Sequence, residues 1–476
     1  MDEVPSPQYS REDVTTGVVH FGVGGFHRAH MAMYHDRLMN EGKALDWGIC
    51  GVGVMEADAR MRDVLRDQDG RYTLVVKHSD GSWDARTIGS LVEYLYAPDD
   101  PEAVIEKLAA PETRIVSLTV TEGGYNLDDT TGEFMEDDPA VVADLEADEP
   151  PKTVFGLVTE ALRRRREREI EPFTVMSCDN LQGNGRLART AFTAFARLRD
   201  AALGDWIAEN VPFPNGMVDR ITPATTDEDV EEVRSRFGVE DRWPVVCEPF
   251  AQWVLEDAFS AGRPPYEDVG VQVVDDVEPY ELMKLRLLNA SHQAIAYFGY
   301  LCGYRLVHDA AQDPLFRDLL ARYMDEEATP TLSEVPGVDL PEYKATLIER
   351  FSNPEVRDTI PRLCAESSDR IPKWLLPVVR EQLADDGEIT RSAAIVASWA
   401  RYAQGVDEDG EEIEIVDRRA ERLRELARDE DTLAFVRNRE LFGDLGDDER
   451  FADAYRSALD SLREHGARAT LERLAE

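Results

Sequence analysis

Short apolar runs alternate with amphipathic stretches through about the first 280 residues of the chain. The runs are rich in β-branched residues, as in GVVHFGV at residues 17–23 and YTLVVK at residues 72–77. Such runs are typical of strands, and the helical patterns between several of them are typical of crossovers in a parallel sheet. The predicted strands cover residues 17–23, 47–54, 72–77, 114–120, 172–178, 244–247 and 269–274. The alternation predicts an α/β fold whose mostly parallel sheet is covered by helices on both faces.

After about residue 278 the pattern changes to one helix after another, with almost no strand-like alternation. The predicted helices cover residues 280–302, 314–326, 341–351, 373–385, 389–404, 417–428 and 447–464. We therefore predict a Rossmann-like α/β domain over residues 1–279 and a mainly α-helical domain over residues 280–476.

The charge balance is strongly acidic, with 96 Asp and Glu against 53 Lys and Arg, a net charge of −43. A surface of this sign repels phosphate backbones and anionic lipids, so we expect no nucleic acid or membrane partner. Seven of the basic residues are lysines and the rest are arginines. Acid excess with scarce lysine is typical of proteins that stay soluble in high salt, which we take as a hypothesis. A GC-rich genome would explain the arginine bias but not the charge.

The chain also lacks the segments that direct proteins out of the cytoplasm. No apolar run approaches the roughly 18 residues of a membrane span. Residues 1–5 (MDEVP) lack the basic start and apolar run of a signal peptide. The five cysteines are widely spaced and fit neither a disulfide framework nor a zinc site. We therefore expect a cytoplasmic protein, either a monomer or a small homo-oligomer.

A glycine turn, GVGGFHR at residues 22–28, follows the first predicted strand and precedes a helical pattern. Glycines at this point let the backbone turn tightly and approach a pyrophosphate, while the helix presents free N–H groups to it. The usual fingerprint has a third glycine where this chain has His27, so the motif is incomplete. Its place between a strand and a helix still favours dinucleotide binding. The predicted cofactor-binding residues of the turn are Gly22, Gly24, Gly25, Phe26 and His27.

Two acidic residues, Glu56 and Asp58, follow the second predicted strand. An acid there would bond the ribose hydroxyls of a dinucleotide and repel a 2′-phosphate, so NAD is favoured over NADP. Spacing does not decide between the two residues. As an alternative, either one could simply cap the helix that follows.

Four ionisable residues cluster at the turn: His27, Arg28, His30 and His35. His27 and His30 are three apart at the start of a helix, but no third ligand is evident nearby, so we predict no metal site. We expect His27 and Arg28 to line the cofactor cleft instead.

The first helix of the second domain is predicted to carry Glu281, Lys284, Asn289 and His292 on one side. At about 100° per residue, the other three lie within about 140° of Lys284 around the helix axis. The remaining positions are mostly apolar, so the helix is expected to be buried. Polar groups on one face of a buried helix need partners, or they line a cavity.

The residue type at Lys284 is informative because lysine is scarce in this chain. A buried lysine can lose its proton, since desolvation disfavours the ammonium, whereas an arginine cannot. Lys284 is therefore a candidate general base in a site without a metal. The alternative is a structural ion pair with Glu281. Asn289 could donate to an oxyanion on the substrate, and a neutral His292 could hold a neighbouring hydroxyl.

A further asparagine, Asn180, lies at the end of a predicted strand in the segment SCDN. The ends of parallel strands are where α/β folds bind ligands, so Asn180 could also donate to the substrate. The alternative is that Asn180 caps the next helix.

Taken together, these segments resemble the polyol-specific long-chain dehydrogenases, the mannitol dehydrogenase family. The resemblance covers essentially the whole chain, and the Lys-x4-Asn-x2-His spacing is quite specific to that family. The segments are GVGGFHRAH at 22–30, TVTEGGY at 119–125, SCDN at 177–180, PNGMVDRITP at 214–223, KLRLLNASH at 284–292 and SSDRIPK at 367–373.

The resemblance implies an NAD-dependent, metal-independent enzyme that interconverts D-mannitol and D-fructose by hydride transfer at C2. It implies that Lys284 takes the proton of the C2 hydroxyl and that Asn180 and Asn289 hold the oxyanion. His292 would orient the substrate, and Glu281 would relay protons between Lys284 and solvent. The residues implied to contact the substrate elsewhere are Asp219, Glu122, Arg362, Arg370 and Lys373.

Three other functions remain open at this point. A uronate reductase of the same family, acting on fructuronate or tagaturonate, would need a cationic pocket for the carboxylate. Another polyol, such as arabinitol or sorbitol, would use the same chemistry. A non-catalytic NAD-binding sensor would keep the fold but would have no use for a base.

Overall fold

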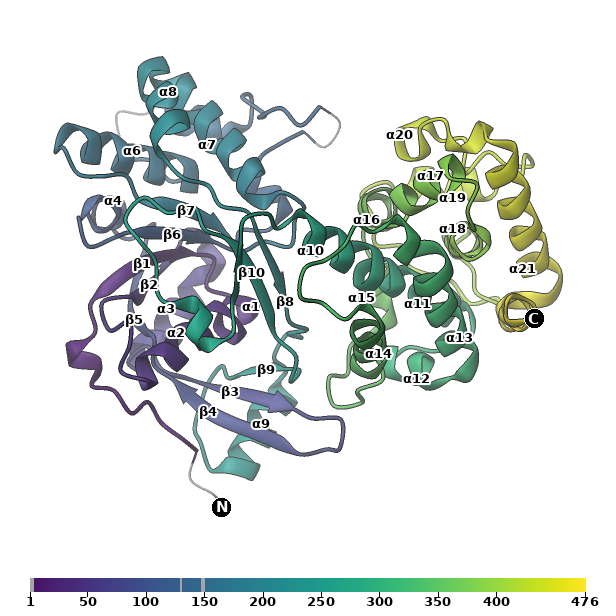
Figure 1. The fold of residues 1–476 in the computed structure, drawn as a ribbon, viewed down its shortest axis with the longest axis horizontal. Helices are drawn as coiled ribbons and strands as arrows, with labels where there is room; N and C mark the ends of the chain where they lie inside the picture. Colours follow the sequence, from purple (N-terminus) through teal and green to yellow (C-terminus); the bar gives the residue numbers. More distant parts are fainter. Residues whose placement is uncertain (1–3, 129–130, 147–149) are drawn as a thin grey trace. The chain divides into compact units, whose positions relative to one another are not determined.

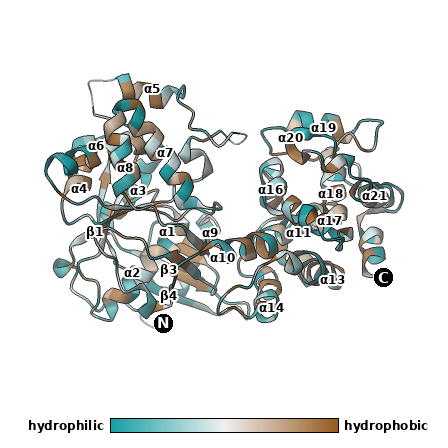
Figure 2. Cartoon of the chain, turned by 45° about the horizontal axis from the view of Figure 1, so that its top comes forward, coloured by the Kyte–Doolittle hydropathy of each residue, from teal (hydrophilic) through white to brown (hydrophobic). Residues whose placement is uncertain are grey.

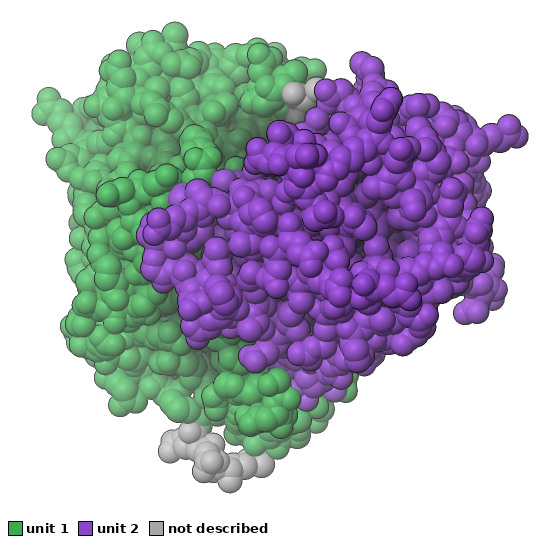
Figure 3. Space-filling model, turned by 45° about the vertical axis from the view of Figure 1, so that its right-hand side comes forward, with its two compact units in different colours: residues 1–278 green, residues 279–476 purple. Residues whose placement is uncertain are grey.

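The computed structural model describes residues 4–128, 131–146 and 150–476, apart from the side chain of Glu122. Residues 1–278 and 279–476 form two compact units, which Figure 3 colours separately. The predicted domain boundary, between residues 279 and 280, lies one residue from this division.

Five strands of the first unit form a parallel sheet in the order β5-β2-β1-β6-β7 (Figure 1). The chain builds toward one edge with β1, β2 and β5, then returns to the middle and builds toward the other edge. This reversal creates a topological switch point between β1 and β6, where open α/β sheets bind ligands beyond the carboxyl ends of the strands. The predicted fold class is confirmed. The strands are β1 (Thr16–Phe21), β2 (Gly48–Gly53), β5 (Leu91–Tyr96), β6 (Ile115–Leu118) and β7 (Thr174–Ser177).

Two small mixed sheets accompany the main sheet, and they correct the prediction of a single sheet. One has the order β4-β3-β9 and the other β11-β10-β8, each with one antiparallel pair. Three predicted strands, at 72–77, 244–247 and 269–274, belong to these sheets because an apolar run does not identify its pairing partner. The strands are β3 (Tyr72–Lys77), β4 (Trp83–Ile88), β8 (Gly216–Asp219), β9 (Val245–Cys247), β10 (Gln252–Glu256) and β11 (Gln272–Val274).

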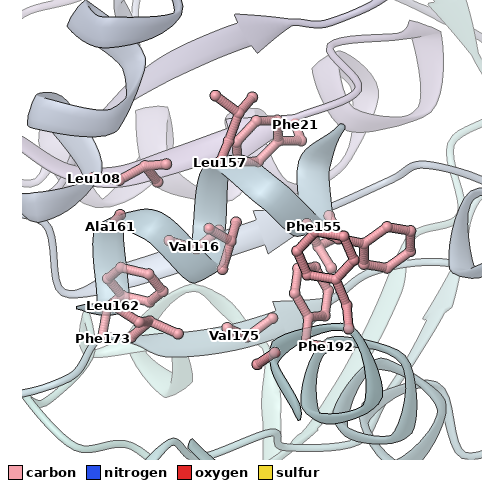
Figure 4. Packing of buried hydrophobic residues seen from close by; sticks show 14 of the residues in the cluster. Phe21, Leu108, Val116, Phe155, Leu157, Ala161, Leu162, Phe173, Val175 and Phe192 are labelled. Carbon is pink, nitrogen blue, oxygen red and sulfur yellow. The ribbon is translucent and has the colours of Figure 1, made fainter. Parts of the chain in front are cut away.

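Both faces of the five-stranded sheet are buried, because alternate residues of each strand point to opposite sides. Val19 packs with α4 (Pro101–Ala109), α6 (Val154–Glu167), α7 (Asn184–Arg199) and α8 (Ala201–Asn210). Figure 4 shows this core, in which the rings of Phe155 and Phe192 lie 5.1 Å apart. Val18 packs on the other side with α1 (Gly25–Ala29), α2 (Met31–Asn40) and α3 (Ala59–Asp67). Each fully buried side chain of this kind contributes about 1.5–3 kcal/mol.

Shorter elements complete the first unit. They are η1 (Arg11–Asp13), η2 (Glu56–Asp58), η3 (Glu122–Tyr125), α5 (Pro139–Glu146), α9 (Asp227–Phe237) and η4 (Tyr266–Val269).

The second unit is built of helices, as predicted, and its helices alternate hydrophilic and hydrophobic positions (Figure 2). At its centre, α18 packs against α11 and α21, with Trp399 stacked edge-on against Phe435. The described residues include no helix that combines the length and apolar character of a membrane span. The helices are α10 (Glu278–Met283), η5 (Lys284–Asn289), α11 (Ala290–Leu301), α12 (Val307–Gln312), α13 (Pro314–Arg322), η6 (Tyr323–Ala328), η7 (Thr329–Thr331), α14 (Leu340–Phe351), α15 (Ile360–Cys364), α16 (Ser367–Trp374), α17 (Leu376–Ala384), α18 (Thr390–Ala403), α19 (Ala420–Ala427), α20 (Arg439–Phe442), η8 (Leu445–Asp447) and α21 (Glu449–Ala475).

Candidate functional site

The glycine turn lies at the switch point of the sheet, between the carboxyl ends of β1 and β6. Gly22 has φ +89°, and a Cβ there would lie 2.1 Å from the carbonyl oxygen of Thr119. The Thr119 hydroxyl also donates to the Gly22 carbonyl oxygen at 2.7 Å. By contrast, a Cβ on Gly24 would meet only the Gly22 carbonyl oxygen among the described atoms, at 3.8 Å. Gly22 therefore fastens the turn to β6, while Gly24 leaves the backbone open where a ligand would approach.

His27 occupies the space that the third glycine of the usual fingerprint would keep clear. Its ring stacks on that of His20 in β1, with centroids 3.4 Å apart and planes 13° apart. His20 contacts the Ser117 hydroxyl at 2.8 Å and the Thr119 hydroxyl at 3.0 Å. Burial lowers the pKa of His20 to about 3 and that of His27 well below its ordinary 6.5. The pair is thus a neutral spacer between α1 and the sheet, and cofactor contact by His27 stays a prediction.

The other basic residues of the turn hold the fold together. The Arg28 guanidinium donates to the Trp243 carbonyl oxygen at 2.5 Å. His30 contacts the Gln252 carbonyl oxygen at 2.9 Å, and His35 contacts that of Trp47 at the same distance. Among the residues that the structure describes, no group of three or more His, Cys, Asp or Glu side chains is placed to hold a metal ion.

The two acids after β2 have different surroundings. One carboxylate oxygen of Asp58 accepts the backbone N–H groups of Val54 and Met55, each at 2.9 Å. Asp58 thus closes the turn that leads into η2 and α3, in keeping with the capping alternative for this residue. Glu56 is exposed on η2. Both the exposed Glu56 carboxylate and the second oxygen of Asp58 remain candidates for the predicted ribose contact.

Asn180 lies just after β7, at the carboxyl edge of the sheet, and is exposed. The alternative that it caps the next helix is wrong, because α7 has Gly183 as its N-cap residue. Its neighbour Asp179 is buried and accepts three hydrogen bonds: from the Val120 N–H at 3.1 Å, the Thr121 N–H at 2.8 Å and the Tyr125 hydroxyl at 2.7 Å.

The loop after β6 that Asp179 holds is strained. Thr121 has φ 66° and ψ 172°, a region of backbone conformation that is essentially restricted to glycine. Holding a β-branched residue there costs of the order of 1–3 kcal/mol and requires firm surroundings. The next residue is the predicted substrate contact Glu122, whose side chain lies outside the description.

Asp219 is the last residue of β8 and is buried, paired in register with Gln252 of β10. The following Arg220 donates to the carbonyl oxygens of Glu248, at 3.0 Å, and of Ala29, at 2.6 Å. The MVDR segment is therefore tied directly to the end of α1, which follows the glycine turn.

The predicted catalytic residues of the second unit lie on one continuous buried helix. Glu281, Lys284, Asn289 and His292 expose 4%, 5%, 4% and 8% of their surfaces. This burial confirms the prediction that the helix is internal. An amine, an amide and an imidazole on one buried helix can take a proton, donate to an oxyanion and hold a hydroxyl.

This helix is not uniform, which the helical wheel did not anticipate. Residues 284–289 form the π-helical turn η5 between α10 and α11. Such turns have i→i+5 hydrogen bonds, are wider than α-helical turns and occur frequently at functional sites. Lys284 and Asn289 are its first and last residues. An α-helix would separate them by about 140° around the axis, and the wider turn brings them closer to the same side.

The π-helical turn is anchored through Arg286. The Tyr323 hydroxyl donates to the Arg286 carbonyl oxygen at 3.0 Å. The Arg286 guanidinium forms a two-bond ion pair with Glu381, each bond 2.7 Å long, and donates to the Thr331 carbonyl oxygen at 2.6 Å. The backbone and a side chain of the turn are therefore fixed to neighbouring elements of the same unit.

The three basic residues predicted to contact substrate occupy α15 and α16. Arg362 is exposed over about half of its side chain and pairs with Asp358. Arg370 donates to the carbonyl oxygens of Arg362 and Leu363, at 3.1 and 3.2 Å, and so caps the end of α15. Lys373 is exposed on α16.

Sequence reasoning missed Asp179, Tyr323 and Asp358. Asp179 stands beside Asn180 in SCDN, and Asp358 precedes Arg362 by four residues, so both carried a local signal. Tyr323 carried none, because it reaches the π-helical turn only through the tertiary fold.

Comparison with known families identifies the chain. Residues 16–268 match the mannitol dehydrogenase Rossmann domain, and residues 276–463 match the mannitol dehydrogenase C-terminal domain. The chain belongs to the mannitol dehydrogenase family. The resemblance expected from the sequence segments is thereby confirmed.

Two relatives from the mannitol dehydrogenase family align with most or all of this chain. It is 48% identical to mannitol 2-dehydrogenase of Phaeosphaeria nodorum over 479 residues, covering 100% of this chain and 84% of the relative. It is 50% identical to mannitol dehydrogenase 2 of Saccharomyces cerevisiae over 426 residues, covering 89% of this chain and 85% of the relative.

Two solved structures are similar in both fold and sequence. One is Pseudomonas fluorescens mannitol 2-dehydrogenase in ternary complex with NAD and D-mannitol, with a TM-score of 0.91 and 48% identity over 100% of this chain and 97% of that one. The other is a D-sorbitol dehydrogenase in substrate-free form, with a TM-score of 0.91 and 38% identity over 99% of this chain and 98% of that one.

Proposed function

We propose that this protein is a metal-independent, NAD-dependent mannitol 2-dehydrogenase that interconverts D-mannitol and D-fructose. The observation that carries the proposal is the buried set Glu281, Lys284, Asn289 and His292 on a helix interrupted by a π-helical turn. The ternary complex of the 48% identical Pseudomonas fluorescens enzyme with NAD and D-mannitol supports the choice of cofactor and substrate.

In the proposed mechanism, Lys284 in its neutral form accepts the proton of the C2 hydroxyl. Asn289 and Asn180 donate amide N–H groups to the oxygen that becomes negatively charged. His292 holds a substrate hydroxyl, and Glu281 passes the proton from Lys284 toward solvent. Bound NAD supplies the acceptor for the C2 hydride. A lysine base performs this proton transfer without a metal.

The residues of the glycine turn fit a dinucleotide. Gly22 makes the tight turn, and the backbone at Gly24 is open for close approach of a pyrophosphate. We infer that Gly25, Phe26 and the buried His27 shape the same loop. We assign the ribose contact to one of the two acids after β2, either the exposed Glu56 or Asp58 through its second oxygen.

The substrate contacts other than C2 follow the family resemblance. We assign Asp219 and Glu122 to the substrate cleft, and Arg362, Arg370 and Lys373 to the distal hydroxyls. The partners we propose are therefore small polyols and ketoses, with no nucleic acid or membrane, for a cytoplasmic monomer or small homo-oligomer.

A panel of polyols and ketoses with NAD and NADP, monitored by NADH absorbance, tests the proposal. We expect the highest kcat/KM with mannitol and fructose and a preference for NAD. The 38% identical D-sorbitol dehydrogenase structure favours sorbitol as the second candidate substrate. A clear preference for fructuronate over fructose would replace the proposal with a uronate reductase, and NAD binding without any turnover would favour a sensor.

We also propose that the protein is adapted to high salt, because its net charge is −43. Molar salt shortens the screening length to about 3 Å and so weakens repulsion between surface carboxylates. The expected result is a rise of several degrees in the thermal unfolding midpoint, with higher activity, between dilute buffer and molar KCl. Full stability and activity in dilute buffer would refute the adaptation.

A further inference from the structure

The charge of Arg362 is matched by a neighbouring carboxylate. Its Nε donates to one oxygen of Asp358 at 2.6 Å and its Nη2 to the other at 2.5 Å. The same carboxylate accepts the Thr359 N–H at 2.8 Å. The Asp358 side chain is only 9% exposed, against 53% for that of Arg362. The pair is a two-bond ion pair fixed from the buried side.

This ion pair lies near the proposed catalytic helix. Helix α15 packs against α11 at Gly299, where a Cβ would lie 2.8 Å from the Ile360 side chain. Burial alone would raise the pKa of Asp358, but Arg362, and to a smaller extent His292, hold this pKa below its ordinary 3.8. Asp358 is therefore a carboxylate at neutral pH, within electrostatic reach of His292.

The other two basic candidates are engaged differently. Arg370 points its guanidinium at the carbonyl oxygens that end α15 and lies 5.7 Å from the centre of the Trp374 ring. Lys373 is exposed on the following turn of α16. Both α15 and α16 pack against the proposed catalytic helix, and Arg362 is the candidate whose charge is balanced there by a neighbouring carboxylate.

We propose that Asp358 is a specificity-determining residue that restricts the enzyme to neutral polyols and ketoses by pairing with Arg362. This inference rests on the proposed function and deepens it. Asp358 occupies the Nε–Nη2 edge of Arg362, one of the two edges by which a guanidinium can bind a carboxylate with two parallel bonds. The Nη1 edge of Arg362 faces away from Asp358 and can donate to a hydroxyl.

The physical reason is the net charge that a substrate meets. A sugar acid approaching Arg362 is attracted by the guanidinium and repelled by Asp358, so the two effects largely cancel. A neutral ketose loses nothing, because a paired guanidinium still donates hydrogen bonds. A fixed charge of the same sign as an unwanted substrate lowers the affinity for that substrate and so increases specificity.

The test compares fructuronate with fructose as substrates for NADH-dependent reduction. Asp358→Asn keeps the shape of the side chain and removes its charge. We expect the ratio of kcat/KM for fructuronate to that for fructose to rise about tenfold or more. Asp358→Glu, which keeps the charge, is the matched control and should change the ratio by less than about threefold.

The double variant Asp358→Asn/Arg362→Gln shows whether a gain in fructuronate selectivity depends on the Arg362 guanidinium. The gain in fructuronate selectivity should disappear in it, and a gain that persists would overturn the inference. An unchanged ratio in a folded Asp358→Asn protein would do the same. If Asp358→Asn does not fold, Arg362→Gln alone decides. It leaves the Asp358 charge unbalanced, so the ratio should fall below that of the wild type, and an unchanged ratio would contradict us.

Wild-type kinetics separate this inference from the proposed function. If the wild type reduces fructose and oxidises mannitol, the variant ratios test Asp358 alone. If the wild type prefers fructuronate, the proposed function and the role of Asp358 both fail.

A different observation, the buried carboxylate of Asp179, carries a second inference. Its three hydrogen bonds join the end of β7 to the strained loop after β6, and the Tyr125 hydroxyl lies 2.6 Å from the Ser177 hydroxyl as well. Burial raises the pKa of Asp179, and these three donors lower it. We infer that Asp179 is a positioning residue, which fixes the backbone on which Asn180 meets the substrate oxygen.

Double-variant kinetics test this role. Asp179→Asn places an amide N–H against backbone donors, so we expect kcat for mannitol to fall about 10- to 100-fold. This fall should be no larger than the one caused by removing an oxyanion donor. The Kd for NAD should change by less than about threefold. Because Asp179 acts through Asn180, the Asp179→Asn/Asn180→Ala double variant should be no slower than Asn180→Ala alone. Additive losses, or no loss in a folded Asp179→Asn protein, would overturn the inference.

Discussion

Replacing Lys284 with alanine is expected to lower kcat for mannitol oxidation by about 10²–10⁴-fold, the usual contribution of a positioned general base. The side chain is 5% exposed and opens the π-helical turn that ends in Asn289. No other described lysine lies on this helix, and arginine cannot replace it as a base. NADH formation under saturating mannitol and NAD is the measurement.

The affinity for NAD should stay within about threefold in Lys284→Ala, because the glycine turn belongs to the other unit of the chain. Lys344→Ala is the matched control: this lysine of the same unit pairs with Asp325 and should leave kcat unchanged. A loss of less than about tenfold in Lys284→Ala would mean that the base is misassigned.

Acid is expected to destabilise the first unit strongly, because three buried histidines are held neutral there. Burial lowers the pKa of His20 to about 3, that of His35 to about 4 and that of His27 well below its ordinary 6.5. The unfolded chain binds these protons below about pH 6.5, so their contribution to stability is complete above that pH and is lost as the pH falls. Each contributes a slope of up to about 1.4 kcal/mol per pH unit, or about 4 kcal/mol for all three.

A buried acid opposes this slope. Burial raises the pKa of Glu327 to about 6, so the folded chain takes up this proton before the unfolded one does. Burial also raises the pKa of Asp36 and of Asp179 in the first unit, so the net slope should be smaller than about 3 kcal/mol per pH unit but should still be a loss of stability toward acid. Urea unfolding between about pH 7 and 5 in molar salt measures it.

Two histidine variants make the acid test specific. His27→Phe should reduce the slope by the contribution of one histidine, about 1.4 kcal/mol per pH unit, because the phenyl ring can stack on His20 without titrating. His465→Gln removes a partly exposed histidine from the second unit and should leave the slope unchanged. A free energy of unfolding that is flat between pH 7 and 5 would contradict the neutral stacked pair.

The fold class was predictable because four of the five strands of the main sheet (β1, β2, β6 and β7) are apolar runs, whereas the half-buried edge strand β5 was missed. The apolar pattern placed β3 at its observed bounds, Tyr72–Lys77, but not in its observed sheet. Pairing depends on contacts far along the chain, such as that between β3 and β9. Strands with a mixed pattern, such as β4 (WDARTI), were missed because their side chains are only half-buried.

The candidate site divides in the same way. The positions of the glycine turn after β1, of the buried Lys284 helix and of Asn180 after β7 were predictable, because each lies in a local sequence motif. The stacking of His27 on His20 was not, since it joins a helix to a strand through the core. The π-helical turn η5 was missed as well. It depends on the Tyr323 hydroxyl and the Arg286–Glu381 pair, which lie 37 and 95 residues away in sequence.

The most direct test of Lys284 as the base is chemical rescue of Lys284→Ala by small primary amines during mannitol oxidation with NAD. The missing side chain leaves a buried space where the proposed mechanism places the base, and a neutral amine that enters it would accept the C2 hydroxyl proton. We predict that kcat rises with methylamine concentration and, across amines of similar size, with their basicity. Failure of every small amine to raise kcat, in a variant that still binds NAD and mannitol, would contradict the assignment of Lys284.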